Sequence, residues 1–316
     1  MGKMGKTAFL FPGQGAQYAG MGRELAEAYS AARQAFEEAD DALGLPLSRL
    51  CFEGPEEELA LTENTQPALL AASVATLRVL QRSGFSCDIA AGLSLGEYTA
   101  LVVAGSLAYA DALRLVRRRG RYMQEAVPAG KGAMAAVLGL DRSVVEEMCA
   151  VARTAGWVEP ANYNCPGQIV VAGETAAVER MLELARAAGA RRSVKLPVSA
   201  PFHCRLMEPA GRRLASDLAE IDVHDPTSPV VANVDARPVT RAEQVRRALI
   251  AQVSSPVRFE DSLRYLLDEG VTRFIEVGPG KALTGFVRKV SKGVETANVE
   301  DPATLDRLLE TAGRVC

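Results

Sequence analysis

Residues 92–96 read Gly-Leu-Ser-Leu-Gly and match the G-x-S-x-G pattern of a serine nucleophile. An apolar stretch at 87–91 precedes them and a helical pattern at 95–104 follows, which predicts a tight turn between a strand and a helix. On such a turn the Ser94 hydroxyl is exposed, and the N–H of Leu95 at the helix start can stabilise an oxyanion. The alternative for so short a motif is a turn in which the serine only caps the helix.

A serine nucleophile needs a base within hydrogen-bonding distance, and the sequence has two histidines. His224 lies in a polar connection, IDVHDPTSP, which is typical of a surface loop. His203 lies in PVSAPFHC, where the chain leaves a segment with a pattern of its own, and such junctions commonly form clefts. We therefore predict His203 as the base. No Asp or Glu is spaced so as to indicate an orienting acid, and a backbone carbonyl could take that place.

That segment lies between Pro128 and Pro197 and predicts a β-α-β-β-α-β order, the ferredoxin-like arrangement. On both sides of it strands alternate with helices, which indicates an α/β fold with a mostly parallel sheet covered on both faces. We expect a core of residues 1–127 and 198–316 with residues 128–197 inserted as a subdomain. The predicted core strands are 7–11, 87–91, 229–233 and 272–277, and the predicted helices are 24–39, 66–81, 95–104, 110–125, 202–220, 241–253, 259–269 and 281–292.

The composition is that of an ordinary globular protein, with 48% hydrophobic residues and a net charge of −3. That charge argues against nucleic acid or an anionic membrane as a partner of the whole surface. Six cysteines form no C-x-x-C pair and fit no zinc pattern, so we expect no metal site and reduced thiols in the cytoplasm. No apolar run reaches the roughly 18 residues of a membrane helix, and no exposed apolar helix stands out, which predicts a monomer.

Five motifs occur in one order: FPGQGAQ, GLSLGEY, LVRRRGRYMQEAVPAG, SAPFHC and EVGPGKALTG. In this the chain resembles the malonyl-CoA:acyl carrier protein transacylases, and the acyltransferase domains of fatty acid and polyketide synthases, from about Thr7 to Val290. The resemblance implies a hydrolase-like α/β core with an inserted ferredoxin-like subdomain. It also implies a ping-pong transfer of malonyl from coenzyme A, through a serine ester, to the phosphopantetheine thiol of acyl carrier protein. Malonyl-CoA and the carrier are then the partners, and no cofactor is needed beyond the thioester substrate.

The resemblance also implies roles for individual residues. Ser94 would be the nucleophile and His203 the base, while Gln14 and the Leu95 N–H would form the oxyanion hole. Gln252, in AQVSSPV, matches the residue whose backbone carbonyl orients the histidine, which would account for the absence of an acid partner.

Arg119 matches the arginine that holds the free carboxylate of malonyl, since a guanidinium binds a carboxylate through two parallel charge-assisted bonds. The alternative is a solvated helix face, because Arg117, Arg118 and Arg121 form a basic run with it.

Two other positions bear on the acyl group. Phe202, before the base, is the residue that accompanies malonyl in synthase domains, because a ring there crowds an α-methyl branch. Leu93 departs from the family, which usually has histidine before the nucleophile.

Two other functions compete. A serine hydrolase shares the nucleophile and base, but has no use for a buried arginine. A non-catalytic module that docks on a carrier protein would use Ser94 only as a cap. Because carrier proteins of this kind are acidic, we also expect a basic patch beside the cleft; the candidates are Arg191, Arg192, Lys195, Lys289 and Lys292.

Overall fold

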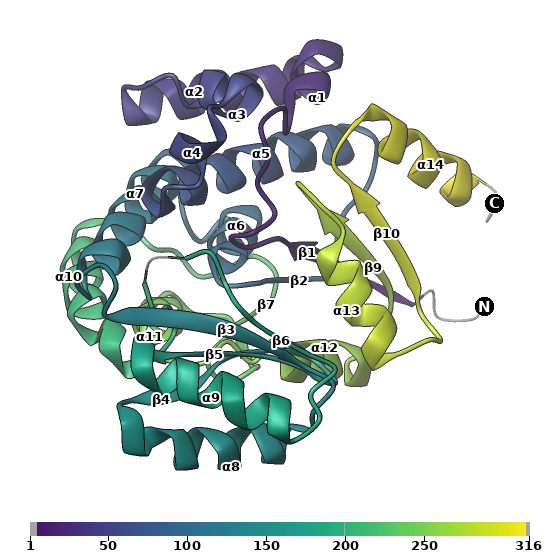
Figure 1. Cartoon of the computed structure of the whole chain (residues 1–316). Coiled ribbons are helices and arrows are strands. Elements are labelled where there is room, and N and C mark those ends of the chain that lie inside the picture. Colours follow the sequence, from purple (N-terminus) through teal and green to yellow (C-terminus); the bar gives the residue numbers. More distant parts are fainter. Residues whose placement is uncertain (1–4, 199, 314–316) are drawn as a thin grey trace.

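The computed structural model describes residues 5–198 and 200–313, and these form two sheets (Figure 1). The larger sheet has the order β10-β9-β1-β2-β7-β8, and its neighbours pair in parallel except for β7 and β8, which are antiparallel. Its strands are β1 (Lys6–Phe11), β2 (Ile89–Gly92), β7 (Val230–Val231), β8 (Pro238–Val239), β9 (Val271–Val277) and β10 (Glu295–Val299). The expected mostly parallel α/β core is confirmed.

Side chains point alternately to the two faces of this sheet, and both faces are buried. In β1, Phe9 and Phe11 belong to one apolar cluster, whereas Ala8 and Leu10 belong to another. The first cluster lies against the long helix α5 (Thr62–Arg82), and the second against α12 (Phe259–Asp268) and α13 (Ala282–Val290). A strand whose residues are apolar on both sides must be covered on both sides, as parallel sheets are.

The remaining helices around the larger sheet lie before, between and after its strands. They are α1 (Arg23–Ala28), α2 (Ser30–Leu43), α3 (Leu47–Glu53), α4 (Glu56–Leu59), α6 (Leu95–Val103), α7 (Tyr109–Glu125), α10 (Glu208–Glu220), α11 (Ala242–Val253) and α14 (Pro302–Gly313), with a short 3₁₀ turn, η2 (Arg205–Met207), before α10.

The smaller sheet has the order β4-β5-β3-β6 and is antiparallel throughout. It consists of β3 (Gly132–Leu138), β4 (Val158–Cys165), β5 (Gln168–Glu174) and β6 (Arg192–Lys195), with α8 (Arg142–Ala152), η1 (Arg153–Ala155) and α9 (Thr175–Ala187) between them. This is the strand order of a ferredoxin-like unit. In β3, Ala133, Ala135 and Val137 pack with residues of α8 and α9, while Met134 and Ala136 join the main core.

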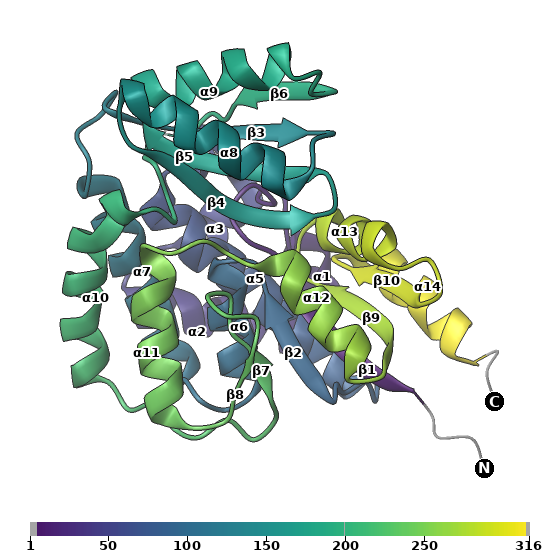
Figure 2. The same cartoon turned by 90° about the horizontal axis from the view of Figure 1, so that it is seen from below.

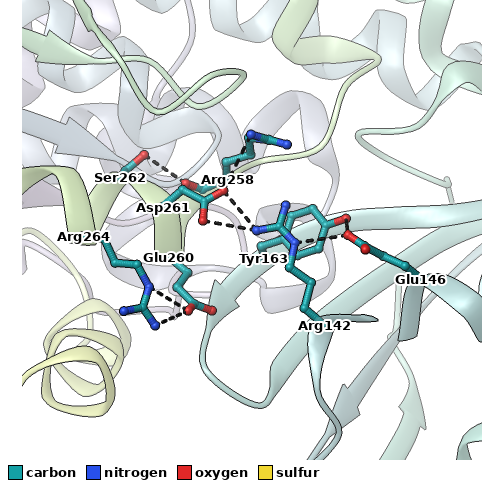
Figure 3. A network of polar contacts seen from close by, with 8 residues as sticks. All are labelled: Arg142, Glu146, Tyr163, Arg258, Glu260, Asp261, Ser262 and Arg264. Atoms are coloured by element: carbon teal, nitrogen blue, oxygen red, sulfur yellow. Dashed lines mark hydrogen bonds and ion pairs between the residues drawn. The ribbon is translucent and has the colours of Figure 1, made fainter. Parts of the chain in front are cut away.

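The smaller sheet meets the rest of the molecule along β4, next to α12 (Figure 2). The backbones of Tyr163 and Val257 are hydrogen-bonded there, with 2.9 Å between the Tyr163 nitrogen and the Val257 oxygen. Side chains add a polar network in which Arg142 of α8 reaches across to Asp261 of α12 (Figure 3). Arg142 also lies over the Tyr163 ring. These partly exposed ion pairs contribute little energy individually, so the backbone contact and the shared apolar core must fix the position of the smaller sheet against the rest of the molecule.

The structure differs from the sequence expectation in three ways. The helix expected at 24–39 is two helices, because Tyr29 is extended, with φ −127° and ψ 121°. The helix expected at 202–220 begins only at Glu208, so the prediction was wrong for residues 202–207, which form a turn and the 3₁₀ segment. Five further elements were not predicted: α3, α4, α14 and the strands β8 and β10, which form the two edges of the larger sheet.

Candidate active site

The nucleophile turn depends on two glycines at the end of β2 and the start of α6. A Cβ on Gly92 would lie 2.0 Å from the Gly96 carbonyl carbon, and a Cβ on Gly96 would lie 2.0 Å from the Phe11 oxygen. Ser94, between them, has φ 53° and ψ −102°, a conformation that non-glycine residues rarely adopt. The G-x-S-x-G pattern therefore reflects a strained turn that turns the serine side chain out of the helix.

Asn233, in the loop after β7, holds this turn from the side. Its Oδ1 accepts from the Ser94 backbone N–H at 2.7 Å, and its Nδ2 donates to the Gly92 carbonyl at 2.7 Å. The two bonds join residues about 140 positions apart and offset part of the strain at Ser94. Sequence reasoning missed Asn233, although a polar residue directly after a buried parallel strand is a signal for a site residue.

Ser94 and His203 are brought together as the sequence predicted. The Ser94 Oγ lies 2.7 Å from His203 Nε2, and His203 Nδ1 lies 2.9 Å from the backbone oxygen of Gln252. A carbonyl oxygen only accepts, so Nδ1 carries the proton and the Nε2 lone pair faces the serine hydroxyl. The arrangement leaves Nε2 ready to take a proton from Ser94.

His203 reaches this position from a turn rather than from the expected helix. Its φ is 60°, and Pro201 precedes it in the same turn. The imidazole is buried, and burial together with the charge of Arg119 lowers the pKa of His203 to about 3. At neutral pH the ring is therefore uncharged, which is the form that can act as a base.

Arg119 of α7 is the one member of the basic run that lies at the nucleophile. Its side chain is 1% exposed, and its Nη2 donates to the Ser94 Oγ at 3.1 Å. In contrast, Arg118 pairs with Asp217 and Arg121 with Glu63 on the surface.

Neutral side chains hold the Arg119 guanidinium in place. Nη1 donates to the Gln66 Oε1 and Nη2 to the Gln252 Oε1, both at 2.8 Å, and the guanidinium lies over the Tyr98 ring. No carboxylate among the described residues forms a hydrogen bond or ion pair with it. A buried guanidinium held by neutral groups is suited to receive an anionic substrate group.

Gln252 of α11 has two separate roles in the geometry. Its backbone oxygen faces His203, while its side-chain amide binds Arg119, the Ser94 carbonyl at 2.9 Å and Glu97 Oε2 at 2.8 Å. Sequence reasoning assigned only the backbone contact and missed Gln66 and Glu97. Glu97 had a visible signal, since it is the one acidic residue in the apolar helix 95–103.

The other predicted residues lie around this centre. Leu95 is the first residue of α6, so its N–H is among those that the helix leaves without an internal partner. Gln14 lies in the loop after β1 and its Nε2 donates to Thr62 Oγ1 at 3.3 Å. That loop passes close to the nucleophile turn, because a Cβ on Gly13 would lie 2.3 Å from the Leu93 oxygen.

Phe202 and Leu93 pack with apolar residues on different sides of the sheet. Phe202 is buried in the main apolar cluster beside His203, and Leu93 packs against the cluster that contains α12 and α13. In the chain, Leu93 directly precedes Ser94 and Phe202 directly precedes His203.

The sequence pattern of the acyl transferase domain matches residues 8–307 of the chain. The chain belongs to this acyl transferase family. The malonyl CoA-acyl carrier protein transacylase of Bacillus subtilis (strain 168) is 50% identical to it over 309 residues, which cover 98% of each chain. The corresponding protein of Escherichia coli (strain K12) is 47% identical over 308 residues, covering 97% of this chain and 100% of the relative.

Solved structures agree with the sequence relatives of this acyl transferase. An acyl carrier protein S-malonyltransferase from Vibrio cholerae O1 biovar eltor superposes with a TM-score of 0.93 at 47% identity, covering 96% of this chain and 99% of the other. A malonyl-transacylase in complex with a type II PKS acyl-carrier protein superposes with a TM-score of 0.94 at 46% identity, covering 97% and 99%.

Two kinds of feature are absent from the described part of this acyl transferase. Residues 5–198 and 200–313 contain no helix with the length and apolar character that a bilayer span requires. The same residues contain no cluster of three or more His, Cys, Asp or Glu side chains suited to a metal ion.

Proposed function

We propose that this acyl transferase moves a malonyl group from malonyl-CoA to the phosphopantetheine thiol of an acyl carrier protein, supplying fatty acid or polyketide synthesis. The observation that carries the proposal is Arg119, a buried guanidinium whose Nη2 lies 3.1 Å from the nucleophile Oγ. A malonyl group attached at Ser94 has its free carboxylate only a few bonds from the ester, within reach of that guanidinium. The names and coverage of the relatives support the same substrates.

In the first half-reaction, the Ser94 Oγ attacks the thioester carbonyl carbon while its proton passes to His203 Nε2. The negative charge on the carbonyl oxygen is stabilised by Gln14 and by the Leu95 N–H at the start of α6. The carbon–sulfur bond then breaks, and the departing sulfur takes the proton from His203. The products are malonyl-Ser94 and coenzyme A in its thiol form.

The second half-reaction reverses these steps with a different thiol. The carrier thiol gives its proton to His203, and its sulfur attacks the ester carbonyl carbon. The carbon–oxygen bond to Ser94 breaks, and the Ser94 oxygen takes the proton back from His203. Bonds and protons balance over the cycle, so the transfer requires no cofactor beyond the coenzyme A thioester.

Acyl selectivity would come from Arg119 and Phe202. Arg119 would hold the malonyl carboxylate through parallel charge-assisted bonds, as an arginine can and a lysine cannot. The Phe202 ring would crowd a methyl branch on the α-carbon of the acyl group, and so favour malonyl over methylmalonyl. Its burial beside His203 supports this role.

We further propose that residues 128–197 form an inserted subdomain on a core of residues 1–127 and 198–316, and that the carrier docks beside it. Arg192 pairs with Leu138, Leu138 pairs with Gln168, and Lys289 donates to Gln168. The exposed cations Arg191, Arg192 and Lys289 therefore gather at one end of the smaller sheet, with Lys195 further along β6 and Lys292 after α13. Charge reversal at Arg191 and Arg192 should raise the KM for the carrier at low salt, and an unchanged KM would exclude this surface.

We also propose that the protein acts as a cytoplasmic monomer. The five cysteines within the described residues are free thiols, as expected in a reducing compartment; Cys316 lies outside those residues. Light scattering across a tenfold range of protein concentration would test the monomer, since a dimer would double the measured mass.

The deciding experiment is intact-mass spectrometry of the chain after mixing with malonyl-CoA, with and without acyl carrier protein. We expect a malonyl adduct that is absent from Ser94→Ala and that moves to the carrier when the carrier is added. An adduct that decays in water without reaching the carrier would indicate a serine hydrolase instead. If no adduct formed, the remaining alternative would be a non-catalytic module that docks on a carrier protein.

A further inference from the structure

Glu97, the third residue of α6, is a buried carboxylate that the proposed mechanism does not use. Its side chain is 1% exposed. Its Oε2 accepts from the Asn233 backbone N–H at 2.9 Å and from the Gln252 Nε2 at 2.8 Å. Its Oε1 has no hydrogen-bond partner among the described residues. A carboxylate in this position is costly unless a positive charge balances it.

The nearest candidate for that charge is Arg119, on the other side of one amide group. The Gln252 side chain receives Arg119 Nη2 on its oxygen at 2.8 Å and presents its nitrogen to Glu97 Oε2 at 2.8 Å. An ionised carboxylate only accepts hydrogen bonds and a guanidinium only donates them. The two charges therefore determine the orientation of the amide, and a reversed amide would oppose donors to Arg119 and acceptors to Glu97.

The balance of charge changes when the site is loaded. In the empty site, one buried cation and one buried anion face each other through Gln252. A malonyl carboxylate on Arg119 adds a second anion, and like charges in a buried site disfavour ionisation of one of them. Glu97 can gain a proton at Oε1 without breaking either of its hydrogen bonds, which both use Oε2.

We propose that Glu97 is a positioning residue that balances Arg119 through Gln252 in the empty site, and that it takes up a proton when a malonyl group occupies Arg119. The proposal rests on the malonyl transfer proposed above. It makes the preference for an acyl group with a free carboxylate depend on the protonation of a residue that does not touch the acyl group.

The surroundings of Glu97 are consistent with a proton exchange near neutral pH. Burial raises the pKa of Glu97 to about 7, with a further upward contribution from Asp235, while the bonds from Gln252 and Asn233 and the charge of Arg119 act in the opposite direction. The neighbouring Tyr98 hydroxyl has a raised pKa because of burial and stays neutral.

His203 does not titrate in the same range, because burial and Arg119 lower its pKa to about 3. A pH effect near 7 that appears only with malonyl would therefore separate Glu97 from the base.

The first test uses the unmodified chain. Malonyl-CoA or acetyl-CoA is added at pH 7.5 in weak buffer with a pH indicator, and proton uptake is divided by the adduct measured by mass. Both reactions release the same coenzyme A thiol, so their difference reports the acyl carboxylate. If malonyl raises the Glu97 pKa by about one unit, about half a proton should be taken up per malonyl adduct in excess of acetyl. Equal uptake for the two acyl groups would overturn the proposal.

The second test compares Glu97→Gln with Glu276→Gln across pH. Glu276 is also a buried carboxylate that accepts two backbone N–H groups, but its donors are Leu283 and Thr284 at the start of α13. As pH rises from 6 to 8, Glu97 ionises, and its negative charge disfavours binding of the malonyl carboxylate at Arg119. The ratio of kcat/KM for malonyl-CoA to that for acetyl-CoA should fall about fivefold in the unmodified chain and in Glu276→Gln, for a one-unit shift.

In Glu97→Gln the same ratio should stay level, because a neutral amide cannot ionise. A fall equal to that of the unmodified chain would refute the role of Glu97. The two proposals fail in different ways: a chain that forms no malonyl adduct overturns the transfer and this inference with it. A chain that transfers malonyl with no excess proton uptake overturns only the inference.

Discussion

Replacement of Arg119 by alanine tests the proposed selectivity most directly. Hydrogen bonds to a charged partner contribute about 1.5–3 kcal/mol each, so a bidentate grip on the malonyl carboxylate corresponds to about 3–6 kcal/mol. Arg119 already donates to Gln66, Gln252 and Ser94 in the empty site, so part of this is exchange between acceptors. The lower end, about 3–4 kcal/mol, predicts a loss of about 10²–10³-fold in kcat/KM for malonyl-CoA.

Acetyl-CoA has no carboxylate, and its kcat/KM should change by only a few-fold. The assay is the rate of transfer to acyl carrier protein from each thioester, with folding checked by urea denaturation. Arg118→Ala is the matched control, because Arg118 comes from the same basic run but pairs with Asp217 at the surface. An equal loss for malonyl-CoA and acetyl-CoA in Arg119→Ala would show that Arg119 supports the structure of the site rather than the acyl carboxylate.

Three further predictions concern the turn and the base. Asn233→Ala removes the bonds to the Ser94 N–H and the Gly92 carbonyl, and should lower kcat about 10–100-fold, corresponding to about 1–3 kcal/mol; single-turnover acylation rates would show it. Gly92→Ala should destabilise the fold by at least about 3 kcal/mol in urea denaturation, because the added Cβ would overlap the Gly96 backbone. Gly285→Ala in α13 is the control: its added Cβ would have no atom within 4 Å, so this substitution should be neutral or stabilising. The depressed pKa of His203 means that, between pH 6.5 and about 3, the unfolded chain binds a proton that the native chain does not, so the free energy of unfolding decreases as pH falls through that window. His203→Asn lacks this titration, so its free energy of unfolding relative to the unmodified chain should rise by about 1.4 kcal/mol for each pH unit by which the pH falls. A difference between the two chains that stays constant in urea denaturation at pH 4, 5 and 6 would contradict this.

Most of the fold could be predicted from periodicity because its strands are buried on both faces or alternate regularly. The β-α-β-β-α-β order predicted for the segment between Pro128 and Pro197 is the order in which β3, α8, β4, β5, α9 and β6 follow one another in the structure. The helix expected at 202–220 shows where this reasoning fails. Its residues are compatible with a helix, but His203 has φ 60°, and contacts with Ser94 and Gln252 that are distant in sequence hold it there.

The candidate site was predictable to the extent that its chemistry is local. Ser94 and its glycines lie within five residues, and a strained turn leaves a recognisable pattern. The positions of Gln66, Glu97 and Asn233 depend on bonds across the sheet, and no spacing in the chain encodes them. Arg119 could be distinguished from its neighbours only by its place in a motif, and its burial became visible only in three dimensions.

The carbonyl partner of His203 has a consequence for the direction of the chemistry. A carboxylate in the place of the Gln252 oxygen would stabilise a positively charged imidazole, and so strengthen it as a base toward a poor nucleophile such as water. A carbonyl dipole does so much less, and burial together with the charge of Arg119 lowers the pKa of His203 and so disfavours its protonated form. A thiol with a pKa near 8.5 gives up its proton far more easily than water, and leaves a tetrahedral carbon equally easily. In the second half-reaction, where the incoming group gives its proton to His203, such a base favours the carrier thiol, while water remains a poor competitor for the malonyl-Ser94 ester.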